Sequence, residues 1–586
     1  MSESVESVEN APRIAEIQAR KSAPFAMTSP ATGAALEAVE ATALDGAGGI
    51  DAIVAKAREA QAAWAAIDLQ KRIRAVAAVR KRILARAEAI AKTVHEETGK
   101  PEVEALLGEI LASADVVSYW ADIIADELEP FEAEIDAMSY PKKSGLIHRE
   151  ARGTIGVIMP WNFPFALPLR TLIPALMAGN AVVFKPSEIT PRTGKLVADL
   201  FEGLLPAGLV GLVQGGGDAG ARLCAADVDL VVFTGSPASG RKVAHACADR
   251  LIPCTLELGG KDAAIVLADA DLDRAANGIV WGAMMNAGQN CGAVERVYAD
   301  KKIVKALTDK VVAATRALRV ADDVGPLTTS AQRDTVARHV EAARSAGATV
   351  LVGGESLDDP RSKLGYRPTV VTIDADDNPL VADETFGPVL PITAVADADE
   401  AIRRANASRY GLTASVWTAD VRRGEALAKK LRAGVVTINN HSFTGALPSA
   451  PWGGVGETGW GITGSPLALD HLTRPRFVCV DRNRAAREMW WYPYSDTLKN
   501  IALAFARLRG GAPSFGSRIG ALFTLIGLLP KRMGELKAAT KGAAAAAKAP
   551  AAAAPKPEPK PEPKPEPKPE PKSEPKSEPK PEPKEP

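Results

Sequence analysis

The sequence predicts an α/β fold with two open, largely parallel sheets covered by helices. From Gly153 onward, short β-branched runs alternate with helical segments, an order typical of strand–helix–strand units in a parallel sheet. The β-branched runs resume at residues 263–267 and 435–438, after several long helical stretches. This second set indicates a second sheet.

The individual elements can be predicted in order along the chain. Residues 1–24 lack apolar periodicity and are expected to form a mobile arm. Residues 50–94 are Ala-rich and carry apolar side chains at helical spacing, so helical hairpins are expected there. The alternating region is expected to contain strands at 155–159, 181–184 and 230–233, and helices at 167–176 and 193–204.

The composition changes twice after Asp481. Residues 482–541 form an extension with the aromatic cluster Trp490-Trp491-Tyr492-Pro493-Tyr494 and an apolar stretch at 519–529. Residues 542–586 are first Ala-rich and then repeat Pro-Glu-Pro-Lys. Proline lacks an amide donor and fixes φ, so this tail is expected to be disordered or in polyproline II.

Length, charge and cysteine usage exclude several classes of protein. A chain of 586 residues is too long for one compact core, so two or three domains are expected. Lys plus Arg equals Asp plus Glu, at 71 each, so no net charge favours nucleic acid as a partner. Five cysteines without metal-ligand spacing indicate reduced thiols in a cytoplasmic protein and no metal site. The start of the chain is acidic and polar, unlike a secretory signal, and no apolar run is long enough to span a membrane.

Cys291 and Glu257 are the strongest candidates for catalysis. The thiol lies in Gly288-Gln289-Asn290-Cys291-Gly292, where small, flexible neighbours let a substrate carbonyl approach closely. Glu257 lies 34 residues earlier, just ahead of the turn at Gly259-Gly260. A nucleophile and a base are the minimum requirement for covalent acyl chemistry through a thioester.

Three upstream segments complete a set of five motifs: Pro160-Trp161-Asn162-Phe163-Pro164, Lys185-Pro186-Ser187-Glu188 and Phe233-Thr234-Gly235-Ser236. In this order, the five motifs resemble the NAD(P)-dependent aldehyde dehydrogenase superfamily. The resemblance extends from about Ser29 to about Asp481. It implies an enzyme that oxidises a small-molecule aldehyde to a carboxylic acid.

The resemblance also implies a domain arrangement. It assigns residues 25–257 to a Rossmann-type NAD-binding domain, with part of a small oligomerisation β-arm near 130–150. Residues 258–440 would form an α/β catalytic domain, and residues 441–481 would return to the cofactor domain and supply an oligomerisation strand. A homodimer or homotetramer is therefore expected.

The catalytic roles follow from the same resemblance. Cys291 would attack the aldehyde as a thiolate, and the side-chain amide of Asn162, together with the Cys291 backbone amide, would stabilise the oxyanion. Glu257 would activate the water that hydrolyses the thioester. Relatives that transfer the acyl group to coenzyme A lack this Glu, so its presence favours a free acid as product.

The cofactor residues are predicted as a group. The run Gly215 to Gly220 matches G-x-G-x-x-G, but the resemblance instead assigns the phosphate and nicotinamide contacts to the strand–helix junction at Gly235, Ser236 and Gly240. A carboxylate at the ribose hydroxyls repels a 2′-phosphate, so Glu188 favours NAD over NADP. The predicted cofactor-binding residues are Trp161, Lys185, Glu188, Gly215, Gly220, Gly235, Ser236, Gly240, Glu384 and Phe386.

The substrate is less well defined, and two classes remain open. Arg170 could bind the distal carboxylate of a semialdehyde. Phe165 and Trp281 instead add apolar surface, and Met285 stands where succinate-semialdehyde enzymes carry a second Arg. An aliphatic or aromatic aldehyde is the alternative. The predicted substrate-pocket residues are Phe165, Arg170 and Asn290.

The C-terminal extension raises two further alternatives. The chain could be a catalytically silent scaffold that acts through this extension. The aromatic and apolar residues within 490–530 could also lie in a membrane interface, since the apolar stretch is too short to span a bilayer. Packing of this segment against the subunit surface is the structural alternative. The predicted location is therefore the cytoplasm, with peripheral membrane contact left open.

Overall fold

A computed structural model describes residues 24–137, 139–357, 359–511 and 514–548. The mobile arm predicted for residues 1–24 lies outside the described residues, apart from Pro24. Contacts divide the chain into two units. The first lies within residues 24–136 and 144–480, and the second within 137–143 and 481–548.

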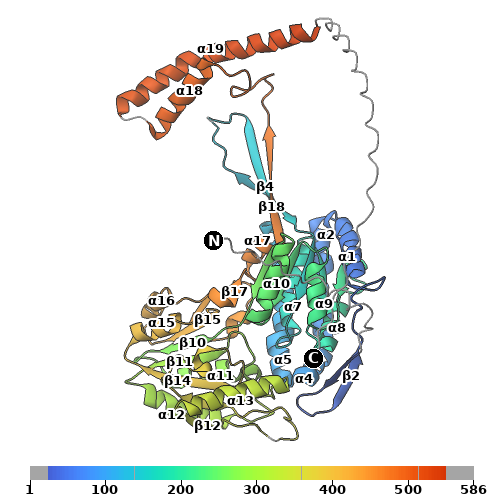
Figure 1. The fold of residues 1–586 in the computed structure, drawn as a ribbon, viewed down its shortest axis with the longest axis vertical. Coiled ribbons are helices and arrows are strands. Elements are labelled where there is room, and N and C mark those ends of the chain that lie inside the picture. Colours follow the sequence, from blue (N-terminus) through green and yellow to red (C-terminus); the bar gives the residue numbers. More distant parts are fainter. Residues whose placement is uncertain (1–23, 138, 358, 512–513, 549–586) are drawn as a thin grey trace, which may run out of the picture. The chain divides into compact units, whose positions relative to one another are not determined.

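The first sheet has the strand order β17-β9-β8-β5-β6-β7, and all neighbours are parallel except the short β17, which is antiparallel to β9. Helices pack on both of its faces (Figure 1). Its strands are β5 (Thr154–Ile158), β6 (Ala181–Lys185), β7 (Val210–Leu212), β8 (Leu230–Thr234), β9 (Cys254–Glu257) and β17 (Gly459–Trp460). The helices after these strands are α7 (Ala166–Met177), α8 (Pro191–Asp199), α9 (Gly217–Ala225) and α10 (Pro237–Asp249).

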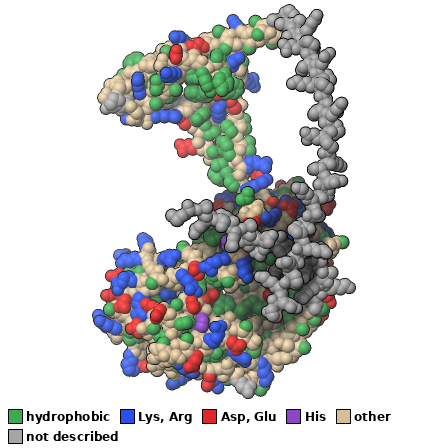
Figure 2. All heavy atoms as spheres, in the orientation of Figure 1, with side chains coloured by type: hydrophobic (Ala, Val, Ile, Leu, Met, Phe, Trp, Pro, Cys, Tyr) green, Lys and Arg blue, Asp and Glu red, His purple; other side chains and the backbone are tan. Residues whose placement is uncertain are grey.

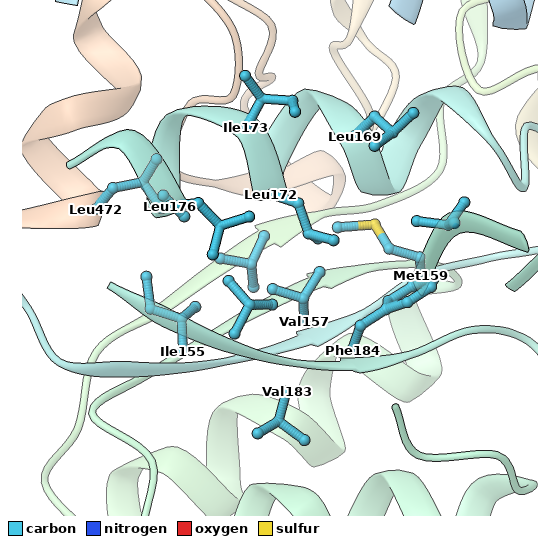
Figure 3. Close-up of a cluster of buried hydrophobic side chains, with 14 of the residues drawn as sticks. Ile155, Val157, Met159, Leu169, Leu172, Ile173, Leu176, Val183, Phe184 and Leu472 are labelled. Carbon is cyan, nitrogen blue, oxygen red and sulfur yellow. The ribbon is translucent and has the colours of Figure 1, made fainter. Parts of the chain in front are cut away.

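Burial on both faces explains why these strands read as continuous apolar runs. Every residue of β5, β6 and β8 is buried, as expected for a parallel sheet between helical layers. Leu172 and Leu176 of α7 lie over one face of the sheet (Figure 3). Val183 of β6 points to the opposite face (Figure 3).

The second sheet has the order β12-β13-β14-β11-β10-β15-β16 and is parallel except for β12. Two separate apolar clusters lie on its two faces, one under α11 to α13 and one under α15 and α16. The strands are β10 (Asp262–Val266), β11 (Val294–Asp300), β12 (Thr349–Val352), β13 (Thr369–Thr372), β14 (Val389–Val395), β15 (Thr413–Trp417) and β16 (Val435–Ile438). The helices are α11 (Leu272–Met284), α12 (Val304–Ala317), α13 (Ser330–Ser345), α14 (Pro379–Ala382), α15 (Ala398–Asn406) and α16 (Val421–Ala428). The predicted α/β fold with two open sheets is confirmed.

Helices precede the first sheet, where helical hairpins were predicted. They are α1 (Ile50–Ala65), α2 (Leu69–Ala77), α3 (Val79–Ala85), α4 (Ala87–Thr98), α5 (Glu102–Ala105), a π-helical turn η2 (Leu106–Leu111) and α6 (Ala112–Glu127). A third sheet, in the order β18-β4-β3, joins β3 (Phe131–Ala133), β4 (Lys143–Ala151) and β18 (Thr473–Asp481). Only Thr473 of β18 is buried, so most of this strand is exposed. Strands are therefore present at both segments predicted for the oligomerisation arm.

The remaining elements are short. A two-stranded antiparallel sheet pairs β1 (Phe25–Thr28) with β2 (Ala35–Val39). The short helical turns are η3 (Met285–Gly288), η4 (Phe443–Ala446), η5 (Gly456–Thr458), η6 (Pro466–Ala468) and α17 (Leu469–Leu472). The helix predicted at 193–204 begins two residues earlier and ends at Asp199, because residues 200–204 form turns.

The second unit is a helical hairpin made of α18 (Asp496–Ala506), a π-helical turn η7 (Arg507–Gly511) and α19 (Phe515–Lys548). Ile501 and Ala504 of α18 pack against Ala521 and Leu525 of α19. The disordered tail predicted from residue 542 was placed too early, because α19 continues to Lys548. Alanine has the highest intrinsic helix propensity, and the Ala-rich run extends the helix. The Pro-Glu-Pro-Lys repeat lies outside the described residues.

Candidate active site

Cys291 follows a backbone reversal at η3. Asn286, Ala287 and Gly288 all have left-handed φ angles, of 54°, 53° and 70°. A Cβ on Gly288 would collide with the backbone carbonyl of Gly387, so glycine is required at this position. The two strained neighbours are held by tertiary contacts, among them a hydrogen bond of 3.0 Å from the Asn286 amide to the Glu104 carboxylate.

The loop brings Cys291 to a cavity of about 260 Å³ that also contains Glu257 and Asn162. The three predicted catalytic residues therefore line one space. The cofactor candidates Trp161, Gly235, Ser236, Glu384 and Phe386 line the same cavity. Its other lining residues are Pro160, Thr234, Leu258, Gly259, Gln332 and Thr335.

Glu257 ends β9 and is buried and held by two hydroxyl groups. Thr463 donates a hydrogen bond to Oε1, and Thr234 donates one to Oε2 over 3.4 Å. Burial raises the pKa of the Glu257 carboxyl, while the Thr463 hydrogen bond and the charge of Arg170 partly oppose this. A carboxyl with a raised pKa is a better proton acceptor when ionised.

The surroundings of the Cys291 thiol disfavour its ionisation. Burial raises its pKa, and the nearby carboxyls of Glu257, Asp262 and Glu384 raise it further. Asn290 shapes the turn, because its Oδ1 accepts the Gly292 amide over 3.1 Å and lies 3.9 Å from the Cys291 sulfur. Formation of a thiolate here requires a base within reach, and Glu257 lines the same cavity.

Asn162 is fixed through both its backbone and its side chain. Its carbonyl accepts hydrogen bonds from Lys100 over 2.7 Å and from Asn286 over 2.9 Å. Its Nδ2 donates one hydrogen to the Gln289 carbonyl over 3.1 Å. A side-chain amide carries two N–H groups, so a second donor remains for an oxyanion in the cavity.

Lys100 and Glu109 support this loop and were missed by the sequence analysis. They form a fully buried ion pair, with 2.6 Å between Lys100 Nζ and Glu109 Oε1. The other oxygen, Glu109 Oε2, accepts the backbone amides of Phe165 and Ala166 at the start of α7, over 2.8 and 3.2 Å. No local pattern indicates this pair, because its targets lie more than fifty residues further along the chain.

A second buried pair, also missed, organises the segment that carries Glu384 and Phe386. Glu295 accepts the amides of Thr385 and Phe386, over 2.7 and 2.8 Å. Lys261 Nζ lies 2.5 Å from the same carboxylate. The pair fixes the backbone, so that the flanking side chains reach the cavity.

Glu384 and Phe386 then contact residues of other elements. Glu384 Oε1 accepts the Gly260 amide over 3.0 Å, and burial raises the pKa of Glu384 to about 8. Phe386 has a left-handed φ of 51° and meets the Trp161 ring edge-on, with 5.6 Å between the centroids.

The other cofactor candidates lie around the first sheet. Ser236 caps α10, where its Oγ accepts the Ser239 amide over 3.3 Å, and Gly240 lies in the first turns of this helix. Lys185 Nζ lies 3.4 Å from Glu188 Oε2, and a Cβ on Gly220 would lie 3.7 Å from the Lys185 side chain. Gly215 lies just before α9 rather than inside it. The roles of these residues stay predictions.

Two of the predicted substrate residues face protein rather than open space. Phe165 is fully buried in the core of the first unit. Arg170 is also buried, and its guanidinium donates hydrogen bonds to the carbonyls of Gly445 and Ala450. The Arg170 Cζ also lies 5.8 Å from the centroid of the Trp452 ring. Their roles, and that of Asn290, stay predictions.

Comparison with known proteins identifies the family. The family model described as "Aldehyde dehydrogenase family" matches residues 17–478. The chain belongs to the aldehyde dehydrogenase family. Among curated relatives, a 4,4'-diapolycopene aldehyde oxidase of Methylomonas sp is 36% identical over 445 residues, covering 75% of this chain and 83% of the relative. A Mycobacterium tuberculosis protein named as a succinate-semialdehyde dehydrogenase of the NADP(+) type is 35% identical, covering 74% of this chain and 84% of the relative.

Solved aldehyde dehydrogenase structures have the same fold. The NAD+ complex of the Bacillus cereus aldehyde dehydrogenase matches with a TM-score of 0.75 and 33% identity, covering 79% of this chain and 94% of that chain. The NAD+ complex of a Mycobacterium tuberculosis aldehyde dehydrogenase matches with a TM-score of 0.74 and 33% identity, covering 78% and 94%. About a fifth of this chain lies outside each match, which is enough to include its C-terminal extension.

Proposed function

We propose that this chain is an NAD-dependent aldehyde dehydrogenase that releases a carboxylic acid. The observation that carries the proposal is the meeting of Cys291, Glu257 and Asn162 in one cavity, beside Trp161 and Phe386. The alternative is that the chain is a catalytically silent scaffold. A complete set of nucleophile, base and oxyanion donor argues for catalysis instead.

The first half of the reaction forms a covalent adduct. Glu257 takes the proton of the Cys291 thiol, and the thiolate attacks the aldehyde carbon to give a thiohemiacetal. The carbonyl oxygen becomes an oxyanion, which accepts hydrogen bonds from the remaining N–H of Asn162 and from the Cys291 backbone amide. The Asn162 donor is fixed before the substrate arrives, because the Lys100–Glu109 pair holds its loop.

The residues present fit an NAD cofactor. Ser236 at the N-terminus of α10 suits a phosphate, and the half-exposed Glu188 carboxylate beside Lys185 suits ribose hydroxyls. A bound NAD supplies the acceptor for the hydride that leaves the thiohemiacetal, so that a thioester on Cys291 remains. Glu257 first releases the proton that it took from the thiol to solvent, and its carboxylate then takes a proton from water. The resulting hydroxide attacks the thioester carbon, and the Cys291 thiolate leaves.

We propose NAD rather than NADP on the basis of Glu188. A carboxylate at the ribose 2′ position repels a 2′-phosphate. Lys185 compensates only in part, because its Nζ is also hydrogen-bonded to the Pro186 carbonyl over 2.9 Å. Because one relative is named for NADP(+), the preference of this chain for NAD has to be measured.

For the substrate, we propose an apolar aldehyde rather than a semialdehyde. The Arg170 guanidinium, the one candidate for binding a distal carboxylate, is directed to two backbone carbonyls. Trp281, on α11, adds exposed apolar surface. One relative is named a 4,4'-diapolycopene aldehyde oxidase and another a succinate-semialdehyde dehydrogenase, so the relatives' names do not favour one substrate class.

One experiment tests these proposals together. The full-length protein is assayed for NADH or NADPH formation with aliphatic aldehydes, aromatic aldehydes and succinate semialdehyde. We expect the highest kcat/KM with an apolar aldehyde and NAD. No reduced cofactor with any aldehyde would support the scaffold alternative, and a preference for succinate semialdehyde would return Arg170 to the substrate pocket.

We also propose that the enzyme is a cytoplasmic homodimer or homotetramer assembled through the third sheet. The exposed side chains of β18 include Phe477, Val478 and Val480, which is typical of a strand that is covered in an assembly. Sedimentation velocity of the wild type and of Phe477→Asp tests this assignment. We expect the variant to shift toward the monomer.

A further inference from the structure

The α18–α19 hairpin leaves one apolar face uncovered. Its internal core uses only part of the apolar side chains, namely Ile501, Ala504, Ala521 and Leu525 with their neighbours. Six others on α19 remain 42% to 78% exposed. They are Phe515, Ile519, Leu522, Phe523, Ile526 and Met533.

These six residues form one stripe. At 3.6 residues per turn, their positions on α19 fall within an arc of roughly 100°. The residues that face α18 occupy a neighbouring arc, so the stripe is not part of the hairpin core. Lys537 and Lys541 continue the same stripe toward the C-terminal end of the helix. Figure 2 shows hydrophobic side chains gathered on this unit, with Lys and Arg around them.

The apolar surface continues from α19 onto α18. A shallow groove of about 450 Å³ lies between the two helices, and its lining includes Leu503, Phe523, Gly527 and Leu528. Arg507 and Asn500 line the same groove. Thr524 completes its lining, and a groove that combines apolar side chains with a guanidinium suits an acyl chain below an anionic headgroup.

Exposed aromatic residues belong to the same unit. Trp491, Tyr492 and Tyr494 all expose more than half of their surface. Arg532 attaches this segment to α19, because its guanidinium donates to the carbonyls of Trp491 and Pro493 over 2.7 and 2.8 Å. Trp and Tyr are enriched at membrane–water interfaces, where their polar and apolar parts are both satisfied.

The charge of the hairpin decides between two occupants of this face. Residues 495–541 contain eight Lys and Arg and two Asp and Glu, a net charge of +6. Two copies joined through this face would bring like charges together. An anionic lipid surface would instead attract the same charges.

We propose that the α18–α19 hairpin binds the surface of anionic phospholipid membranes, with the stripe from Phe515 to Met533 in the interface. The helix lies in the plane of the membrane and does not cross it. Among the described residues, no helix combines the length and apolar character needed for a span. The proposal rests on the hairpin alone and does not depend on the dehydrogenase activity.

Co-sedimentation of the full-length protein with vesicles tests the proposal. We expect binding to vesicles that contain phosphatidylglycerol, weak binding to pure phosphatidylcholine, and loss of binding at high salt. Phe523→Glu should weaken binding by about tenfold or more, because it places a charge in the stripe that enters the membrane interface. Ala538→Glu adds the same charge to α19 at an exposed position outside the stripe, so it should retain most of the binding.

An unchanged thermal unfolding midpoint shows that each variant is folded. Equal sedimentation of wild type and Phe523→Glu would overturn the proposal. Wild type that stays in the supernatant with anionic vesicles would also overturn it. If Phe523→Glu instead lowers the oligomeric state in sedimentation velocity, the stripe is a contact between copies and the membrane assignment is wrong.

Discussion

Lys100 Nζ lies 2.6 Å from Glu109 Oε1, and neither side chain is accessible to solvent. The two residues have separate targets: Lys100 binds the Asn162 carbonyl, and Glu109 binds the amides at the start of α7. The pair thus connects the helices before the first sheet to the loop that presents the oxyanion donor. Removal of one partner leaves a buried charge without compensation.

The first prediction concerns this pair. Lys100→Met should lower the free energy of unfolding by about 3–5 kcal/mol, as is usual when one partner of a buried pair is removed. It should also lower turnover, because the Asn162 carbonyl loses a donor. Lys305→Met is the matched control, since Lys305 pairs with Asp309 on the surface. Urea unfolding measures both variants, and equal midpoints would mean that the Lys100–Glu109 pair has no special role.

The second prediction tests the nucleophile. Cys291→Ala should reduce turnover by several orders of magnitude, because no thiohemiacetal can form. The exposed Cys479 provides the control, and Cys479→Ala should retain wild-type turnover. Steady-state NADH formation is the measurement. More than about a tenth of wild-type turnover in Cys291→Ala would remove this residue from the mechanism.

The third prediction separates acylation from hydrolysis. Glu257→Gln cannot accept a proton from water, so thioester hydrolysis should become rate-limiting. Stopped-flow measurements are made at high pH, where more of the Cys291 thiol is ionised without the Glu257 base. They should show a burst of up to one NADH per site, followed by slow turnover. Mass spectrometry should detect the acylated enzyme. Wild-type steady-state rates would show that another group activates the water.

The fourth prediction uses the hydrogen bond between Thr463 and Glu257. This bond lowers the pKa of Glu257 and so opposes the effect of burial. Thr463→Val removes it and should raise the pKa further. Since Glu257 acts as a base when ionised, the acidic limb of the kcat profile should move to higher pH. Thr463→Ser retains the hydroxyl and should leave the limb in place, whereas an equal shift in both variants would point to packing.

The sequence predicts the fold well where the signal is local. The strands of the first sheet are buried on both faces, so their apolar runs stand out from the helices between them. Boundaries are less certain, as the end of α8 at Asp199 and of α19 at Lys548 show. Turn formation ends α8 early, and the high helix propensity of alanine extends α19.

The supporting residues of the site could not be predicted in this way. Lys100 and Glu109 act on residues that are distant in sequence, and the same holds for Lys261 and Glu295. The left-handed backbone at Ala287 is equally unexpected, because alanine rarely adopts it. Such features depend on tertiary contacts that a single sequence does not reveal.

The last prediction concerns cofactor choice. Glu188 is half-exposed, and its Oε2 lies 3.4 Å from Lys185 Nζ, which is almost fully buried. In Glu188→Thr, the carboxylate that repels a 2′-phosphate is lost, while the Lys185 ammonium remains and attracts it. The ratio of kcat/KM for NAD to that for NADP should therefore fall, by about tenfold for a change of 1.4 kcal/mol.

Glu188→Gln serves as the isosteric control for this change. It removes the charge but retains a hydrogen-bond acceptor for the ribose hydroxyls, so it should relieve the repulsion of NADP with a smaller loss for NAD. Initial rates with both cofactors at a fixed, saturating aldehyde concentration give the two ratios. A wild type that prefers NADP, or a ratio that neither variant changes, would mean that the Glu188 carboxylate does not face the 2′ position.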